Sequence, residues 1–208
     1  MSAPLSTKEV IFEQRILKAS GLYKGSKIDG DWGPKTEAAH AEFTRQAHAL
    51  EAQFGSFDAR TEKNILTLAL PAQRIARRFM QHALKLVPEG WTVRIISGTR
   101  TYEQQDALYA QGRTTPGPRV TNARGGQSNH NFGLAWDIGI FDNSGRYVTQ
   151  TYQYEALGPK IMGLDLYPIE WGGNWKSLKD YPHYEYGTGL NLTTRRRRFE
   201  DGTLLLTK

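Results

Sequence analysis

An aspartate stands in the middle of an apolar segment, and this feature constrains the fold more than any other in the sequence. The segment LAWDIGIFD, residues 134–142, is rich in aliphatic and aromatic residues and is typical of a β-strand. A carboxylate at Asp137 is costly in such surroundings unless it is paired or bound to a metal ion. We therefore expect a partner for Asp137 nearby in the fold.

His130 precedes Asp137 by seven residues in the stretch GGQSNHNFGLAWDI, residues 125–138. Seven extended residues would span about 23 Å, whereas two ligands of one metal ion must lie within a few ångströms of each other. The chain must therefore fold back between them, and Gly133 permits a bend because glycine tolerates a positive φ. A buried hydrogen-bonded pair without a metal ion is the alternative to a shared metal site.

A metal site needs a further ligand, and the chain has five histidines and no cysteine. Three histidines fall on predicted helices, where surface or capping roles are expected: His40, His48 and His82. His183 differs because it follows Pro182 in KDYPHYEY, where the residue before the proline must be extended. Together with the first pair, His183 would complete a three-ligand zinc site whose fourth position stays open for water, as in catalytic sites.

The composition limits the classes of partner. The chain has 208 residues, 38% of them apolar, which suffices for a core and for one or two domains. Lys and Arg exceed Asp and Glu by 27 − 21 = 6, so we expect affinity for an anionic surface such as the bacterial envelope. RRRR, residues 195–198, is interpreted as a solvated basic tail, because no aromatic residues are interleaved with it. Neither a nucleic-acid partner nor a membrane span is expected.

The first ~50 residues predict a small all-helical module. STKEVIFEQRILKASG, residues 6–21, begins with a capping Ser-Thr pair and has the apolar periodicity of a helix. A turn-rich link follows, and Pro34 suits the first turn of a second helix, PKTEAAHAEFTRQAHALEAQF. The pattern breaks at a linker near residues 51–58, so we assign residues 1–52 to this module.

The larger domain, residues 53–208, mixes helices with strands. Two helical segments divided at Pro71 are followed by the strand WTVRIISG, a helix, a long loop and the strand that holds Asp137. DNSG, residues 142–145, is typical of a hairpin turn. The expected fold class is therefore α+β, with a small antiparallel sheet and flanking helices that hold the zinc site.

Several motifs in this domain resemble the family of zinc D-Ala-D-Ala and L-alanyl-D-glutamate peptidases. GGQSNHNFGLAWD fits the family pattern SxHxxGxAxD, and DYPHYE fits its later [E/D]xxH element. ISGTRTYEQQDALYAQGR resembles its SGxR segment, and EWGGNW, residues 170–175, looks like its tryptophan-glycine stretch. The motifs occur in the family's order, and the closest likeness is to phage endolysins of this type.

The resemblance implies a metal centre with one zinc ion and a general base. Asp180 is implied as the base that acts on the attacking water, and the implied zinc ligands are His130, Asp137 and His183. An alternative makes Asp180 a turn cap and Glu185 the base, because residues 183 and 185 share a strand face.

The same resemblance implies three further contacts with the substrate. Arg100, at the end of a predicted strand, would help the metal stabilise the developing oxyanion. Ser128 and Gln105 match positions that would bind the substrate. For Arg100, a plain surface arginine is the alternative.

The N-terminal link carries a second resemblance. GLYKGSKIDGDWGPKTEAAHAEF, residues 21–43, is similar to the helical peptidoglycan-binding module often joined to cell-wall hydrolases. Asp29 and Asp31 are interpreted as turn and capping residues, because the other acidic positions of a calcium loop are missing. The resemblance implies that residues 1–52 bind peptidoglycan.

The two resemblances together imply an endolysin, a zinc endopeptidase that cuts the peptidoglycan stem peptide between L-Ala and D-Glu. We expect a monomer, because such an enzyme works on an insoluble polymer. A D-Ala-D-Ala carboxypeptidase on the same scaffold and a non-catalytic cell-wall-binding protein are the alternatives. The N-terminal sequence lacks the apolar stretch of a signal peptide. We therefore expect the protein to wait in the cytoplasm of a host bacterium and to reach the cell wall, in the periplasm, after a separate membrane-permeabilising protein releases it.

Overall fold

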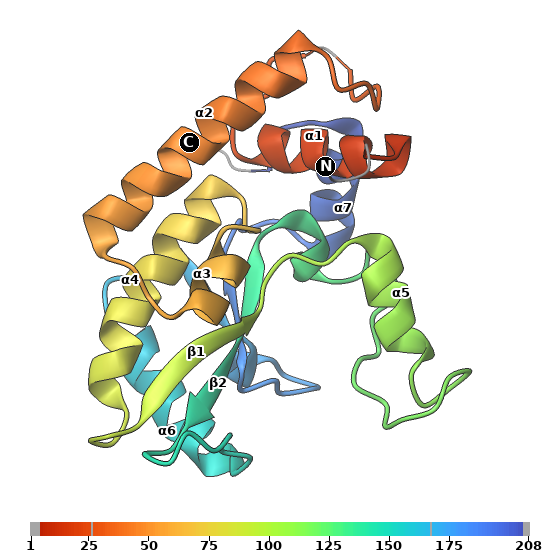
Figure 1. The fold of residues 1–208 in the computed structure, drawn as a ribbon. Helices are drawn as coiled ribbons and strands as arrows, with labels where there is room; N and C mark the ends of the chain where they lie inside the picture. Colours follow the sequence, from red (N-terminus) through yellow and green to blue (C-terminus); the bar gives the residue numbers. More distant parts are fainter. Residues whose placement is uncertain (1–4, 26, 167, 206–208) are drawn as a thin grey trace. The chain divides into compact units, whose positions relative to one another are not determined.

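The computed structural model describes residues 5–25, 27–166 and 168–205, and their chain folds into two compact units (Figure 1). The helical unit contains the segments up to Gln46, from Arg100 to Gly133 and from Thr188 onward. The sheet unit contains Ala47–Thr99 and Leu134–Gly187. Each unit is thus assembled from segments that are distant in the sequence.

Helices and strands alternate irregularly along the described residues. The helices are α1 (Thr7–Ala19), α2 (Pro34–Phe54), α3 (Ala59–Ile65), α4 (Leu70–Leu86), α5 (Tyr102–Ala110), α6 (Thr151–Met162) and α7 (Leu192–Asp201). Two short 3-10 turns are η1 (Asn129–Phe132) and η2 (Gly172–Asn174). The strands are β1 (Thr92–Ser97), β2 (Ala135–Phe141), β3 (Ile169–Trp171) and β4 (His183–Tyr186).

In the helical unit, a buried glutamine of α1 holds the link between the first two helices. The Gln14 amide nitrogen donates to Asp29 Oδ1 at 2.7 Å and to Thr36 Oγ1 at 3.0 Å. The Gln14 amide oxygen accepts from the backbone N–H groups of Asp29 and Gly30, both at 3.1 Å. These bonds satisfy polar groups that would otherwise be buried without partners. The predicted turn role of Asp29 is confirmed.

The arginine run belongs to α7 and is not a tail, and of its four residues only Arg196 and Arg197 are exposed as the interpretation of a solvated run expected. Asn191 caps the helix through a bond from Thr194 N–H to its side-chain oxygen at 2.9 Å. Arg195 is only 5% exposed, and its Nε donates to Thr188 Oγ1 at 2.7 Å. Phe199, on the same helix, packs against Phe12 and Phe132. The sequence pattern missed this helix because its one fully buried apolar position follows four charged ones.

The sheet unit contains a four-stranded antiparallel sheet in the order β1-β2-β4-β3. Trp136 pairs with Tyr184, which in turn pairs with Trp171, so one aromatic residue from each of three strands lies in a row. Phe79 of α4 packs on this row, with its ring centroid 4.5 Å from that of Tyr184. Because side chains alternate along a strand, the neighbours of these aromatics face the opposite side of the sheet.

The expected α+β class is confirmed, with a small antiparallel sheet and an N-terminal helical region. The helix predicted from Pro34 has the expected bounds, and the strands predicted at 91–98 and 134–142 correspond to β1 and β2. The linker is shorter than expected, because α2 continues to Phe54. The assignment of residues 1–52 and 53–208 to separate functional domains stays a prediction.

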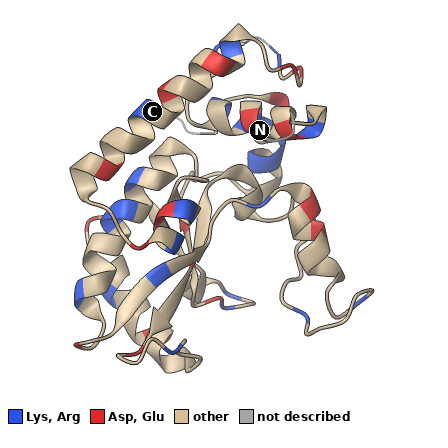
Figure 2. Cartoon of the chain, in the orientation of Figure 1, with Lys and Arg blue, Asp and Glu red and all other residues tan. Residues whose placement is uncertain are grey.

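Basic residues are spread over several helices, as Figure 2 shows for α1, α2, α4 and α7. Some of this charge is neutralised locally. Arg77 is fully buried in α4 and pairs with Glu62 at 2.7 Å. Within the part of the chain that the structure describes, no helix is long and apolar enough to cross a membrane.

Candidate metal centre

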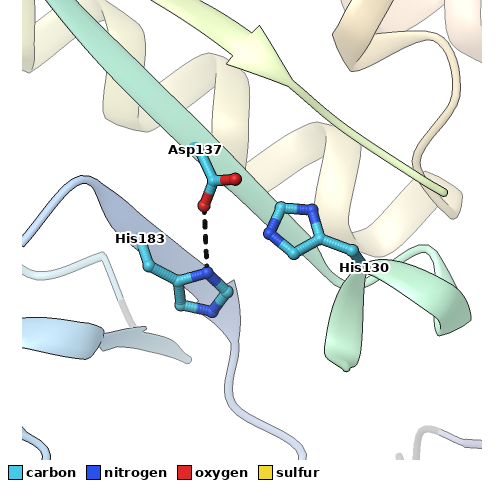
Figure 3. A group of neighbouring side chains, drawn as sticks. All are labelled: His130, Asp137 and His183. Atoms are coloured by element: carbon cyan, nitrogen blue, oxygen red, sulfur yellow. Dashed lines mark hydrogen bonds and ion pairs between the residues drawn. The ribbon is translucent and has the colours of Figure 1, made fainter. Parts of the chain in front are cut away.

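His130, Asp137 and His183 point toward one another (Figure 3). Each offers one ligand atom, and these atoms lie within 4.8 Å of one another. Among the described residues, this is the group of histidines and acids that could hold a metal ion. Both histidines are buried, and Asp137 is partly exposed. The structure therefore brings together the three residues that the sequence predicted to converge.

Strand register places two of these residues side by side. Asp137 of β2 is the cross-strand partner of His183 of β4, and Asp137 Oδ1 lies 3.1 Å from His183 Nδ1. Asp137 is also the one position of β2 that is not buried. The carboxylate predicted to be costly in an apolar strand thus occupies the strand's partly open position, with an imidazole as its partner.

The third residue, His130, sits in the short turn η1 just before β2. Ser128 caps this turn, and its hydroxyl oxygen accepts from His130 N–H at 3.4 Å. Gly133 ends the turn with φ of 70°, the left-handed conformation that glycine adopts without strain. The expected fold-back at Gly133 is confirmed, because the backbone reverses there before entering the strand.

Asn131, next to His130, is a positioning residue that no pattern in the sequence indicated. Its side chain is fully buried. The Asn131 amide nitrogen donates to Arg100 O at 2.9 Å, and its oxygen accepts from Gly126 N–H at 3.0 Å. In addition, Arg100 N–H donates to His130 O at 3.0 Å. These hydrogen bonds hold the backbone at Arg100 against the turn that carries His130.

Within the tryptophan-glycine stretch of residues 170–175, residues 171–175 support the loop before His183. Trp171 Nε1 donates to Tyr181 O at 2.8 Å, and Asp180 N–H donates to Gly172 O at 3.2 Å. The Trp175 ring lies against the His183 imidazole, with centroids 4.9 Å apart. This stretch therefore fixes both the backbone of residues 180–183 and one face of a candidate ligand.

The imidazole of His183 is held by two carboxylates. Its Nδ1 faces Asp137, and its Nε2 lies 2.9 Å from Glu185 Oε2. Burial lowers the pKa of His183, but the bonds to Asp137 and Glu185 outweigh this effect and raise the pKa to about 10. The two carboxylates thus favour the protonated form of the ring, and a metal ion must displace a proton to bind it.

The structure gives the local contacts of the remaining predicted residues, and their chemical roles stay predictions. Asp180 begins the turn into β4, where His183 N–H donates to Asp180 O at 3.2 Å. Gln105 is buried, and its amide nitrogen donates to Ala123 O at 2.9 Å, so it holds the loop before the metal group. Ser128 caps the turn of His130. Gln105 and Ser128 thus have structural uses that the sequence did not reveal.

Comparison with known proteins shows which family this segment resembles. Residues 121–186 match the family model described as D-alanyl-D-alanine carboxypeptidase. The matched segment contains all three residues of the candidate metal centre and also Asp180. Residues 121–186 are therefore similar to this peptidase family, over less than half of the chain.

Two individual proteins are similar to the chain. The peptidoglycan L-alanyl-D-glutamate endopeptidase CwlK of Bacillus subtilis is 42% identical over 103 residues, which cover 47% of this chain and 62% of that relative. The chain thus spans less than two thirds of the relative's length. The crystal structure of the L-Ala D-Glu endopeptidase ChiX of Serratia marcescens has a TM-score of 0.45 and 23% identity, over 62% of this chain and 88% of that one.

The support from the tryptophan-glycine stretch can be tested at Gly172. A Cβ added there would collide with the Asp180 carbonyl oxygen and would lie 3.1 Å from His183 Cβ. Gly172→Ala must therefore displace the backbone that carries both residues. Since a misplacement of about 1 Å can cost about 100-fold in rate, we expect any peptide hydrolysis at this centre to fall by roughly 10- to 100-fold, with weaker binding of a metal ion.

The matched control is Gly33→Ala, because a Cβ at Gly33 meets no atom within 4 Å. Zinc affinity is measured by competition with a chromogenic chelator, and thermal unfolding of both variants checks that the fold persists. A Gly172→Ala protein with the zinc affinity and rate of the Gly33→Ala protein would show that this stretch does not position the site.

Proposed function

We propose that the chain is a peptidoglycan hydrolase, a zinc-dependent endopeptidase that cuts the stem peptide between L-Ala and D-Glu. The observation that carries the proposal is the convergence of His130, Asp137 and His183 within a segment that matches a peptidase family. The bond is suggested by the 42% identity to an L-alanyl-D-glutamate endopeptidase.

The donor set of the candidate centre fits zinc. Two imidazoles and one carboxylate are common zinc ligands, and the absence of cysteine from the sequence is consistent with a catalytic rather than a thiolate structural site. Zinc holds such atoms at about 2.0–2.2 Å, which places them within roughly 4 Å of one another. The observed limit of 4.8 Å requires only small side-chain adjustments.

When bound, zinc would supply a Lewis acid and would make water a stronger acid. Side chains of the protein would then transfer the protons and stabilise the developing charge. The Asp180 carboxylate accepts a proton from the attacking water and delivers it to the amine of the leaving D-Glu, which avoids an unstable anionic leaving group. The Arg100 guanidinium donates hydrogen bonds to the oxygen of the scissile carbonyl as negative charge develops there.

A D-Ala-D-Ala carboxypeptidase is the second candidate function, favoured by the description of the matching family. The two activities differ in their products. Cleavage between L-Ala and D-Glu creates a new N-terminal D-Glu, whereas the carboxypeptidase releases a C-terminal D-Ala. A purely wall-binding protein would create neither product.

The direct test is mass spectrometry of purified peptidoglycan after incubation with the zinc-loaded protein. We expect fragments with N-terminal D-Glu, no fragments after chelation of the metal, and recovery on addition of Zn²⁺. Asp180→Asn should retain zinc and lose about 100- to 10,000-fold in rate, the usual contribution of a general base.

The control for this test is Asp142→Asn, which changes an acid of the distant DNSG turn that binds Ser144 and Arg146. Its rate should match that of the unaltered chain. Loss of C-terminal D-Ala alone would establish the carboxypeptidase, and full activity of the chelated protein would contradict both metal-dependent readings.

The proposal includes wall binding by the N-terminal module. A cavity of about 580 Å³ lies in the helical unit, along the link that resembles wall-binding modules. Its walls combine apolar side chains with two ammonium groups: Leu22, Ala38, Ala39, Lys24 and Lys35. Glu42 also lines the cavity, but its carboxylate is engaged by Arg45 and Gln46. Apolar walls beside two cations suit the alanine methyl groups and free carboxylates of stem peptides.

Cosedimentation with purified cell walls tests the module. In an Asp180→Asn background, Lys24→Gln with Lys35→Gln should weaken wall binding several-fold, because each exposed ion pair contributes about 0.2–1 kcal/mol. Lys8→Gln with Lys63→Gln makes the same change in net charge at exposed positions outside the cavity. Equal losses in the two double variants would mean that general charge attraction, and not the cavity, binds the wall.

The proposal also includes an endolysin's mode of action, with release from the bacterial cytoplasm to the cell wall. The resemblance of residues 21–43 to a wall-binding module, in a chain whose residues 121–186 match a peptidase family, supports it. Induced expression in a bacterium should leave the culture intact until a membrane-permeabilising protein is co-expressed, and turbidity should then fall. Lysis without the second protein would contradict this part of the proposal.

A further inference from the structure

A buried carboxylate, Glu185, stands beside the candidate metal centre without a part in the chemistry proposed above. It belongs to β4 and is only 3% exposed. Burial of an ionised carboxylate costs several kcal/mol unless hydrogen bonds compensate for the lost water. Its Oε2 lies 2.9 Å from Nε2 of His183, which supplies such a bond.

Strand geometry explains how the two residues meet. His183 and Glu185 are separated by one residue on β4, so their side chains leave the same face of the sheet. The residue between them, Tyr184, points to the opposite face and joins the aromatic row under α4. The bond between Glu185 and His183 is therefore fixed by the strand and by the packed core beneath it.

The two nitrogens of the His183 ring face different partners. Nδ1 is directed at Asp137, a member of the metal group, whereas Nε2 is directed at Glu185. A neutral imidazole carries one proton, and the nitrogen without it offers the lone pair that a metal binds. When a metal ion that also binds Asp137 displaces one proton, the Glu185 carboxylate at Nε2 holds the other, so the lone pair for the metal lies on Nδ1, toward Asp137.

The geometry points to Glu185 as a positioning residue that sets the tautomer and ring orientation of His183 for metal binding through Nδ1. This inference rests on the proposed metal-dependent function. It also accounts for Glu185 without making it the general base, because its Oε2 engages the ring nitrogen that faces away from Asp137. The Trp175 ring, at 4.9 Å between centroids, restrains the same imidazole from a face.

The test measures metal binding, which does not depend on turnover. Glu185→Gln keeps the size of the side chain, but its amide can also donate to Nε2 and so stabilise the wrong tautomer. Glu185→Ala removes the acceptor. We expect both variants to bind Zn²⁺ about 10- to 100-fold more weakly, the usual effect of losing such a partner. The visible spectrum of bound Co²⁺ should change in band position or intensity, because the ligand orientation is no longer fixed.

Glu170→Gln is the matched control, because Glu170 is the cross-strand partner of Glu185 on β3. It makes the same change from carboxylate to amide one strand away. Zinc affinity and the Co²⁺ spectrum should stay near those of the unaltered chain, and thermal unfolding of the metal-free proteins shows which variants fold. If Glu185→Ala fails to fold, the isosteric Glu185→Gln decides the question.

The outcomes separate this inference from the proposed function. If the unaltered protein binds metal and the Glu185 variants have the same metal affinity and Co²⁺ spectrum as it does, the positioning role of Glu185 is overturned. The proposed function would stand. Equal weakening by Glu170→Gln and Glu185→Gln would also overturn the positioning role, because the effect would then come from strand charge. Unaltered protein that binds neither Zn²⁺ nor Co²⁺ would contradict the proposed function, and the inference would fall with it.

Discussion

The pairing of Asp137 with His183 across β2 and β4 is the interaction on which the rest of the site depends. Strand pairing has a side-chain period of two, so a slip by one residue would turn Asp137 into the apolar core and an aromatic residue outward. The aromatic row of Trp136, Tyr184 and Trp171 resists such a slip, because its rings already pack beneath α4. The hydrophobic core thereby sets the register of two candidate ligands.

The metal-free site has a definite charge balance. Asp137 and Glu185 flank one imidazole, and their hydrogen bonds outweigh the effect of burial to keep His183 protonated well above neutral pH. A divalent ion bound at Nδ1 would replace one proton with a larger positive charge beside Asp137. Metal binding should therefore release a proton, and it should tighten as the pH rises toward the pKa of His183. The carboxylates that favour the protonated imidazole would thus also favour a bound cation.

The residues of the site that were predictable from the sequence are those whose residue type is unusual at its position in the local pattern. Asp137 stands out because an acid is rare in an apolar strand, and Gly133 because a sharp turn needs a positive φ. The supports were harder to predict. Asn131 and Gln105 act through buried side-chain bonds to distant backbone groups, and such partners leave no periodic pattern in the sequence.

The fold shows the same limit. α1, α2, β1 and β2 were predictable from caps and apolar periodicity. β3 has three residues, too few for a period, and exists because β4 offers it hydrogen-bonding partners. Residues 195–198 read as a solvated run, yet Arg195 is buried because its guanidinium has a hydroxyl partner in Thr188. Contacts with residues distant in the sequence thus determine whether β3 forms and whether Arg195 is buried. The local sequence gives no sign of such contacts.

One divalent ion is proposed to join the three converging side chains. X-ray diffraction from zinc-loaded crystals, with data collected on both sides of the zinc absorption edge, locates that ion. We expect a single anomalous peak bound by one nitrogen each of His130 and His183 and by an oxygen of Asp137. A zinc ion held elsewhere, or bound without His130, would contradict it.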